Sequence, residues 1–156
     1  DGSSGVIKDF RQKNNVLLVL FSWPQSQERI HELTEAYDRL KKLNTIVLAV
    51  PMGNLNKQIL AEITKDLPFP VVTEGAQEIV DSYVLYRRTL THPDILGEGN
   101  IPDHLEFLID RFGYLRARSI PAVDELTWSD MNLLSQQLSQ LNQEDEILPP
   151  PKDHVH

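Results

Sequence analysis

The sequence predicts an α/β fold, because an apolar strand, an amphipathic helix and a second apolar strand follow one another with short connections. Residues 16–21 form a continuously apolar run, which is typical of a strand that is covered on both faces. Apolar residues then recur every three or four positions across residues 25–43, which indicates a helix with one buried face. A second apolar run spans residues 45–50. This order and spacing predict a right-handed βαβ unit with two parallel strands.

The middle of the chain predicts two further helices. Apolar spacing indicates one helix at residues 55–65 and another at residues 76–86, with a brief extended segment at residues 69–72 between them. Residues 87–100 contain proline and two glycines and show no clear period. We therefore expect a long loop in this stretch.

The last third of the chain predicts a hairpin and a final helix. Residues 105–109 and 115–119 have strand character and flank a turn in which Gly113 can take a positive φ, so an antiparallel hairpin is expected to join the sheet. Thr127 and Asp130 are spaced like an acidic variant of a capping box ahead of a helical apolar pattern. We expect this helix to cover a face of the sheet.

The length of 156 residues suits one domain. We expect a lead segment at residues 1–15, a domain at residues 16–141 and a tail at residues 142–156. The tail is acidic and proline-rich, so it is expected to be flexible. The start at Asp1 carries neither an initiator methionine nor a signal pattern, which favours a piece of a longer protein.

Composition excludes several classes of function. The net charge of −8 opposes binding to a phosphate backbone, so no nucleic-acid partner is expected. The chain has no cysteine, which removes disulfides, thiolate nucleophiles and cysteine-ligated metals. The longest apolar run, residues 16–21, is far shorter than the roughly 20 residues of a membrane helix. We therefore expect no direct membrane insertion of this segment.

Three stretches, in this order, resemble the thioredoxin-like superfamily, in particular its TlpA-like and peroxiredoxin-like branch: residues 16–26, Ile101-Pro102, and residues 107–113. The resemblance implies a three-layer fold with a central mixed β-sheet flanked by helices. It also implies a degenerate active site, with a cis-proline at the Ile101-Pro102 bond. The positions of that site are Trp23, Pro24, Gln25, Ser26, Ile101 and Pro102.

The resemblance places Trp23-Pro24-Gln25-Ser26 where active relatives have Cys-Pro-x-Cys. An indole and a protonated hydroxyl cannot perform thiol–disulfide exchange. We therefore expect a redox-inactive module that binds a protein or peptide partner, with Trp23 either as an exposed anchor or packed on the helix end. The alternative is an oxidoreductase or peroxidase relative that works without cysteine. Hydrolysis is not expected, because neither Ser22 nor Ser26 has an identifiable base in the sequence.

Histidines carry a second resemblance. Asp103-His104, ahead of the strand at residues 105–109, resembles the Sco copper-chaperone branch, and the chain ends in His154-Val155-His156. A cysteine-free domain with these features is similar to soluble domains fused to the membrane copper-resistance protein CopD. The resemblance implies a periplasmic domain of a larger membrane protein, with the membrane-embedded copper-transport domain of the same polypeptide as its partner. No cofactor is required, and the metal chemistry expected is weak Cu(II) binding through His104, His154 and His156.

Overall fold

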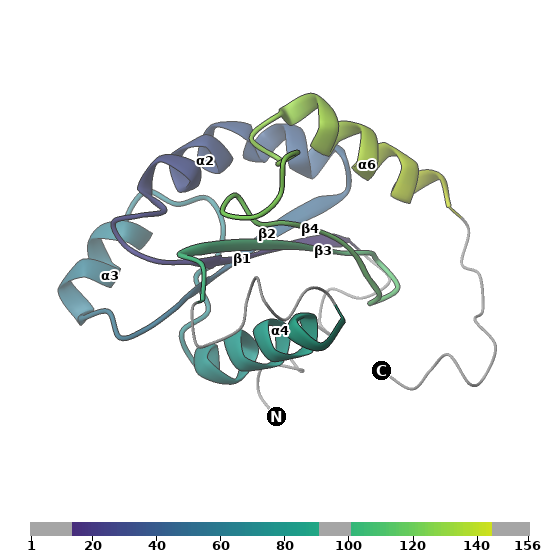
Figure 1. Ribbon diagram of the computed structural model, residues 1–156. Helices are drawn as coiled ribbons and strands as arrows, with labels where there is room; N and C mark the ends of the chain where they lie inside the picture. Colours follow the sequence, from purple (N-terminus) through teal and green to yellow (C-terminus); the bar gives the residue numbers. More distant parts are fainter. Residues whose placement is uncertain (1–13, 91–100, 145–156) are drawn as a thin grey trace.

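The structure is a computed structural model that describes residues 14–90 and 101–144, with side chains except at residues 84–90. Within those residues, four strands form one mixed sheet in the order β2-β1-β3-β4 (Figure 1). The central strand β1 (Asn15–Phe21) pairs in parallel with β2 (Thr45–Pro51) and antiparallel with β3 (His104–Ile109). The edge strand β4 (Leu115–Ser119) completes an antiparallel hairpin with β3. The predicted α/β class and the mixed sheet are confirmed.

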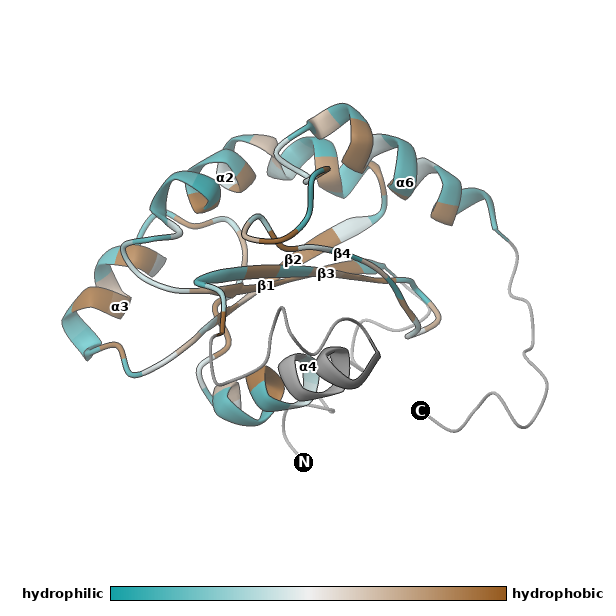
Figure 2. Ribbon diagram, viewed as in Figure 1, coloured by the Kyte–Doolittle hydropathy of each residue, from teal (hydrophilic) through white to brown (hydrophobic). Residues whose placement is uncertain are grey.

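Helices cover both faces of the sheet. Helices α2 (Gln27–Lys42), α3 (Lys57–Thr64) and α6 (Met131–Gln143) lie on one face, and α4 (Ala76–Leu90) lies on the other (Figure 1). Hydrophobic residues concentrate on the strands and on the helix faces turned toward them (Figure 2). The molecule therefore has the three layers that the sequence predicts.

The sheet divides the core into two clusters, and the alternation of side chains along β1 explains why this strand is apolar throughout. Leu17, Val19 and Phe21 pack on the side of α2 and α6. The residues between them pack on the side of α4. Every side chain of β1 is buried, including Asn15.

The amide of Asn15 is buried because it joins three parts of the chain. Its Nδ2 donates to Oδ1 of Asn142 in α6 at 3.0 Å. Its Oδ1 accepts the backbone N–H of Arg111 at the turn of the hairpin, at 3.1 Å. The Asn142 Nδ2 in turn donates to the carbonyl of Leu43, at the end of α2. These bonds connect the start of the first strand to the last helix.

Two local expectations are wrong. The cap of α6 is Asp130, whose side chain accepts the N–H groups of Asn132 and Leu133, whereas Thr127 lies in the preceding turn. The capping-box spacing pointed to Thr127 because an aspartate three residues on can serve either as its partner or as the cap itself. Helix α4 extends to Leu90, so residues 87–90 are helical rather than part of a loop.

Several other expectations agree with the structure or fall outside it. The hairpin turn has Gly113 at a φ of 94°, and Val71 of the expected extended segment forms a parallel bridge to Ala49. Most of the lead segment, residues 91–100 and residues 145–156, including His154 and His156, lie outside the described residues. In the part of the chain that the structure describes, no helix is both long and apolar enough to cross a membrane.

Candidate functional site

The predicted site positions lie at one edge of the sheet. Residues 22–26 form the turn between β1 and α2, and Ile101-Pro102 leads into β3. The antiparallel register pairs Phe21 with His104, so the chain after β1 and the chain before β3 meet at the same edge. The structure therefore brings the two sequence-predicted stretches together.

The cis-proline expectation is wrong in its position. Among the described residues, the cis peptide bond is Trp23–Pro24, and the Ile101–Pro102 bond is not cis. Both are X-Pro bonds, for which the two isomers differ intrinsically by only about 0.5–1 kcal/mol. The sequence alone therefore does not determine which of the two bonds adopts the cis form.

The hydroxyl of Ser26 belongs to a buried hydrogen-bond network. Ser26 is the N-cap residue of α2, but its side chain does not cap the helix. Its Oγ accepts the backbone N–H of Ser22 at 3.0 Å and lies 2.7 Å from Nδ1 of His104. The other ring nitrogen of His104, Nε2, lies 2.5 Å from Oε2 of Glu106. With the imidazole proton on Nε2, the hydroxyl would donate to Nδ1 and Nε2–H would donate to the carboxylate.

Arg29 of α2 closes the network from the other side. Its Nε and Nη2 donate to the two carboxylate oxygens of Glu106 at 2.7 and 2.9 Å, and its Nη1 donates to Glu32. Glu106 is 2% exposed. Burial raises the pKa of Glu106, but hydrogen bonds from Arg29 and His104 outweigh burial and lower it to about 2. The network therefore contains a fully ionised, bidentate ion pair under the edge of the sheet.

Sequence reasoning missed most of this network. His104 is the base that Ser26 lacked in the sequence analysis, but it lies 78 residues away in the chain. Glu106 and Arg29 were not singled out. A signal was present, because Glu106 interrupts the strand His-Leu-Glu-Phe-Leu-Ile, whose other residues after the histidine are apolar. A carboxylate at such a position, two residues from a histidine, lies on the same face of the strand and needs a buried partner.

A pocket of about 300 Å³ opens above the network and is lined by Ser26, Arg29, His104, Glu106 and hydroxyl residues of the loop before α6. Ser26 is only 1% exposed. Both ring nitrogens of His104 already have partners, so a metal ion would have to displace one of them. No group of three or more metal-ligating side chains occurs in residues 14–90 and 101–144. His104 as a copper ligand therefore stays a prediction.

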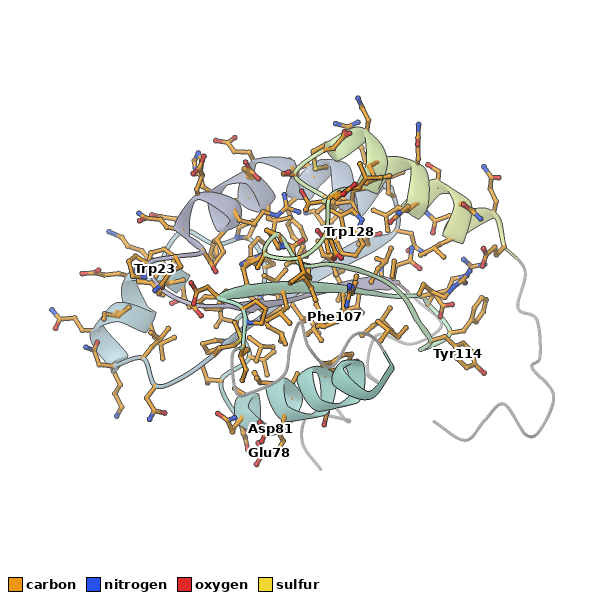
Figure 3. The ribbon with its side chains drawn as sticks, viewed as in Figure 1. Trp23, Glu78, Asp81, Phe107, Tyr114 and Trp128 are labelled. Atoms are coloured by element: carbon orange, nitrogen blue, oxygen red, sulfur yellow. The ribbon has the colours of Figure 1, made fainter. Side chains whose placement is uncertain are left out.

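On the other side of the turn, Trp23 and Pro24 line an open groove of about 790 Å³ between the start of α2 and the end of α3. Trp23 is half-buried and packs in part against the core, and Figure 3 shows it at the end of the molecule beside α3. Among the described residues its indole N–H has no hydrogen-bond acceptor, and Pro24 and Ile101 are exposed. We call Trp23 and Pro24 the Trp23 face.

No protein-family model matches the chain, and no curated protein matches it. Several solved structures are similar to the chain. A putative thioredoxin from Neisseria meningitidis has a TM-score of 0.61 and 17% identity, over 96% of this chain and 86% of that one. The fold is thioredoxin-like. The mitochondrial 2-Cys peroxiredoxin from Plasmodium falciparum (TM-score 0.60, 13% identity, 90% and 84% covered) is also similar.

A putative thiol:disulfide interchange protein DsbE from Chlorobium tepidum has a TM-score of 0.56 and 16% identity, with 86% of this chain and 84% of that one covered. These structures confirm the thioredoxin-like fold that the sequence resemblance implied. Identities this low establish the fold alone, and partners and activity need separate evidence.

Proposed function

We propose that this domain is a redox-inactive binding module that docks an extended segment of a protein partner on the Trp23 face. One observation carries the proposal. At the edge where the resemblance expects a thiol pair, the chain has a half-buried indole whose N–H has no acceptor among the described residues. Three residues on, it has a hydroxyl enclosed in a buried network. Exposed aromatic anchors with an unused polar group are typical of binding surfaces.

The buried network supports this role because it holds the turn that carries Trp23 in place. It fixes the turn of residues 22–26 through Ser22 and Ser26, and it ties α2 to β3 through Arg29 and Glu106. A turn held on both sides presents Trp23 in one orientation, so less conformational entropy is lost when a partner binds. Thiol–disulfide exchange is not available to this chain, since it has no cysteine.

Two measurements test the proposal. The first is the reduction of insulin disulfides by dithiothreitol, whose rate we expect the domain to leave at the buffer value. The second is binding to an array of short peptides from reduced, carboxymethylated α-lactalbumin, compared between wild type, Trp23→Ala and the control Leu126→Ala. Leu126 is 75% exposed and lies outside the Trp23 face. Peptide binding should be lost in Trp23→Ala and kept in the control.

Accelerated insulin reduction would overturn the redox-inactive role and favour the alternative, an oxidoreductase or peroxidase that works without cysteine. Peptide binding that is the same in Trp23→Ala and wild type would overturn the docking role. Trp23→Ala should still unfold cooperatively, with a melting temperature only several degrees below that of wild type, which is the check that a loss of binding is not a loss of folding.

A second candidate function is ester hydrolysis, favoured by the hydroxyl–imidazole–carboxylate order of Ser26, His104 and Glu106. In such a reaction the Ser26 Oγ would attack the ester carbonyl while its proton passes to Nδ1 of His104. The ester C–O bond would then break, the alcohol would leave with the proton from Nδ1, and water, giving a proton to Nδ1, would hydrolyse the acyl–Ser26 bond to release the carboxylic acid and restore the serine hydroxyl. The 1% exposure of Ser26 argues against it. Hydrolysis of p-nitrophenyl acetate that is lost in Ser26→Ala and kept in Ser22→Ala would establish this activity.

The copper context and the periplasmic location belong to the same proposal. They are supported by the resemblance of Asp103-His104 and of the terminal histidines, not by a ligand cluster in the described residues. Calorimetric titration with Cu(II) should show weak binding that fades as the pH falls through about 6.5, where free imidazole titrates. Truncation after Pro151 should remove most of this binding, because both nitrogens of His104 are occupied. Binding that survives truncation combined with His104→Ala would exclude these ligands.

A further inference from the structure

The groove beside Trp23 has an apolar floor. Trp23 and Ile30 line it from the α2 side, and Ile63 and Leu67 line it from the α3 side. Its volume of about 790 Å³ is large enough for several side chains of a bound segment. The groove opens to solvent, so a segment of a partner can enter it without a change in the fold.

The rim of the groove is acidic and unpaired. Glu28, Glu62 and Asp66 line it and are exposed. None of them forms a hydrogen bond or ion pair with another residue that the structure describes. By contrast, the neighbouring Glu32 and Glu35 of α2 pair with Arg29 and His31.

Among the residues that the structure describes, no lysine or arginine lines the groove, and His31 is the one basic residue that does. The carboxylates of the rim are therefore free to meet a cationic group of a partner. Exposed charge pairs of this kind add little affinity each, but they select a partner and speed its encounter. The overall charge of −8 acts in the same direction.

We propose that this groove binds an extended protein segment in which lysine or arginine side chains alternate with large apolar ones. The apolar side chains would contact the floor beside Trp23, and the cationic side chains would pair with the three rim carboxylates. This inference rests on the proposed docking role of the Trp23 face and adds the chemistry of the partner to it.

The test uses a fluorescein-labelled probe peptide of sequence Gly-Lys-Phe-Lys-Leu-Lys-Gly and two matched peptides. In one, glutamate replaces each lysine, and in the other, serine replaces phenylalanine and leucine. Fluorescence anisotropy at low and moderate salt should show the probe binding about tenfold or more tightly than either matched peptide. The preference over the glutamate peptide should shrink at higher salt.

Protein variants locate the site. The double variant Glu62→Lys/Asp66→Lys reverses two of the three rim charges and should weaken probe binding about tenfold. The control Glu74→Lys/Glu125→Lys makes the same change in net charge at two exposed carboxylates that do not line the groove. It should change probe binding by less than about threefold. Trp23→Ala should abolish binding of the probe.

The outcomes separate the two proposals. Equal losses in the two double variants would mean that net charge, not the groove, attracts the probe, and would overturn this inference. Equal binding of the lysine and glutamate peptides, both dependent on Trp23, would overturn the cationic preference and leave the docking role standing. Probe binding that does not depend on Trp23 would overturn both.

Discussion

The chain has two tryptophans, and they lie in opposite environments (Figure 3). Trp128, just before α6, is 2% exposed, and its indole N–H donates to Oε1 of Gln137 at 2.9 Å. Its backbone N–H donates to the hydroxyl of Ser119. Trp23 is half-buried, has no such partner among the described residues and borders a groove. The indole N–H of Trp128 has a hydrogen-bond acceptor inside the protein, as expected of a structural tryptophan. The indole N–H of Trp23 has none among the described residues and borders a groove, so it is available to a partner.

The largest effect on stability is expected from removing the side chain of Trp128. Trp128→Ala should lower the free energy of unfolding by about 3–5 kcal/mol, because it leaves a cavity in the cluster shared with α6. Urea denaturation followed by circular dichroism measures the change. Trp128→Phe, which keeps most of the volume and loses the N–H, should cost less. A loss below about 1 kcal/mol in the alanine variant would show that Trp128 is not a core residue.

The second prediction concerns the hydrogen-bond network of Ser26, His104, Glu106 and Arg29. Glu106→Gln removes the charge that Arg29 faces and should destabilise the domain by about 3 kcal/mol. It should also speed amide exchange at Ser22 and Ser26, because the turn loses part of its support. Replacing both partners, in Arg29→Met/Glu106→Leu, should cost less than the single variant, since no unpaired charge remains. Equal losses of stability in the two variants would show that the destabilisation comes from losing the ion pair, and not from leaving the charge of Arg29 buried without a partner.

The third prediction follows from the low pKa of Glu106, which is about 2 in the folded protein, below its ordinary value of 4.5. A carboxyl whose folded pKa is depressed stabilises the fold above its unfolded pKa and loses that contribution as the pH falls toward the folded value. Stability should therefore fall between about pH 4.5 and pH 2 in wild type. The fall should be shallower in Glu106→Gln and unchanged in Glu125→Gln. Acid titration of the melting temperature checks this.

The smallest effect on stability is expected at Trp23 itself. Trp23→Ala should cost only about 1 kcal/mol, because the side chain is half-buried and packs only in part on the core. The same urea denaturation used for Trp128 measures it. A cost as large as that of Trp128→Ala would erase the contrast between the two tryptophans and make Trp23 a core residue.

The elements set by local periodicity were predictable. The strands β1 and β2 and helix α2 lie within two residues of their expected ends, because their apolar spacing reflects burial on one face or two. The hairpin was predictable from Gly113 and its flanking strands. The N-cap at Asp130 and the end of α4 depend on local backbone geometry, which the spacing of apolar residues does not determine.

The candidate site was predictable only in part. The resemblance indicated residues 23–26 and residues 101–102, and the register of β1 with β3 brings them to one edge. The bonds among Ser26, His104 and Glu106 depend on which strand pairs with which, and on a register that one sequence does not reveal. The groove depends on the packing of α3 beside α2, which local periodicity does not specify either.

The position of β1 in the sheet has a consequence for how the chain folds during its synthesis. Among the described residues, β1 is the strand nearest the N-terminus and it is central, and its second neighbour, β3, begins only at His104. Until then the β1-α2-β2 unit exposes one unpaired edge of its most apolar strand, a state that favours intermolecular pairing. Because Asn15 is also bonded to Asn142 in α6, the fold closes only when nearly the whole domain is available. A nascent chain that stops short of α6 should therefore aggregate or engage chaperones rather than fold in stages.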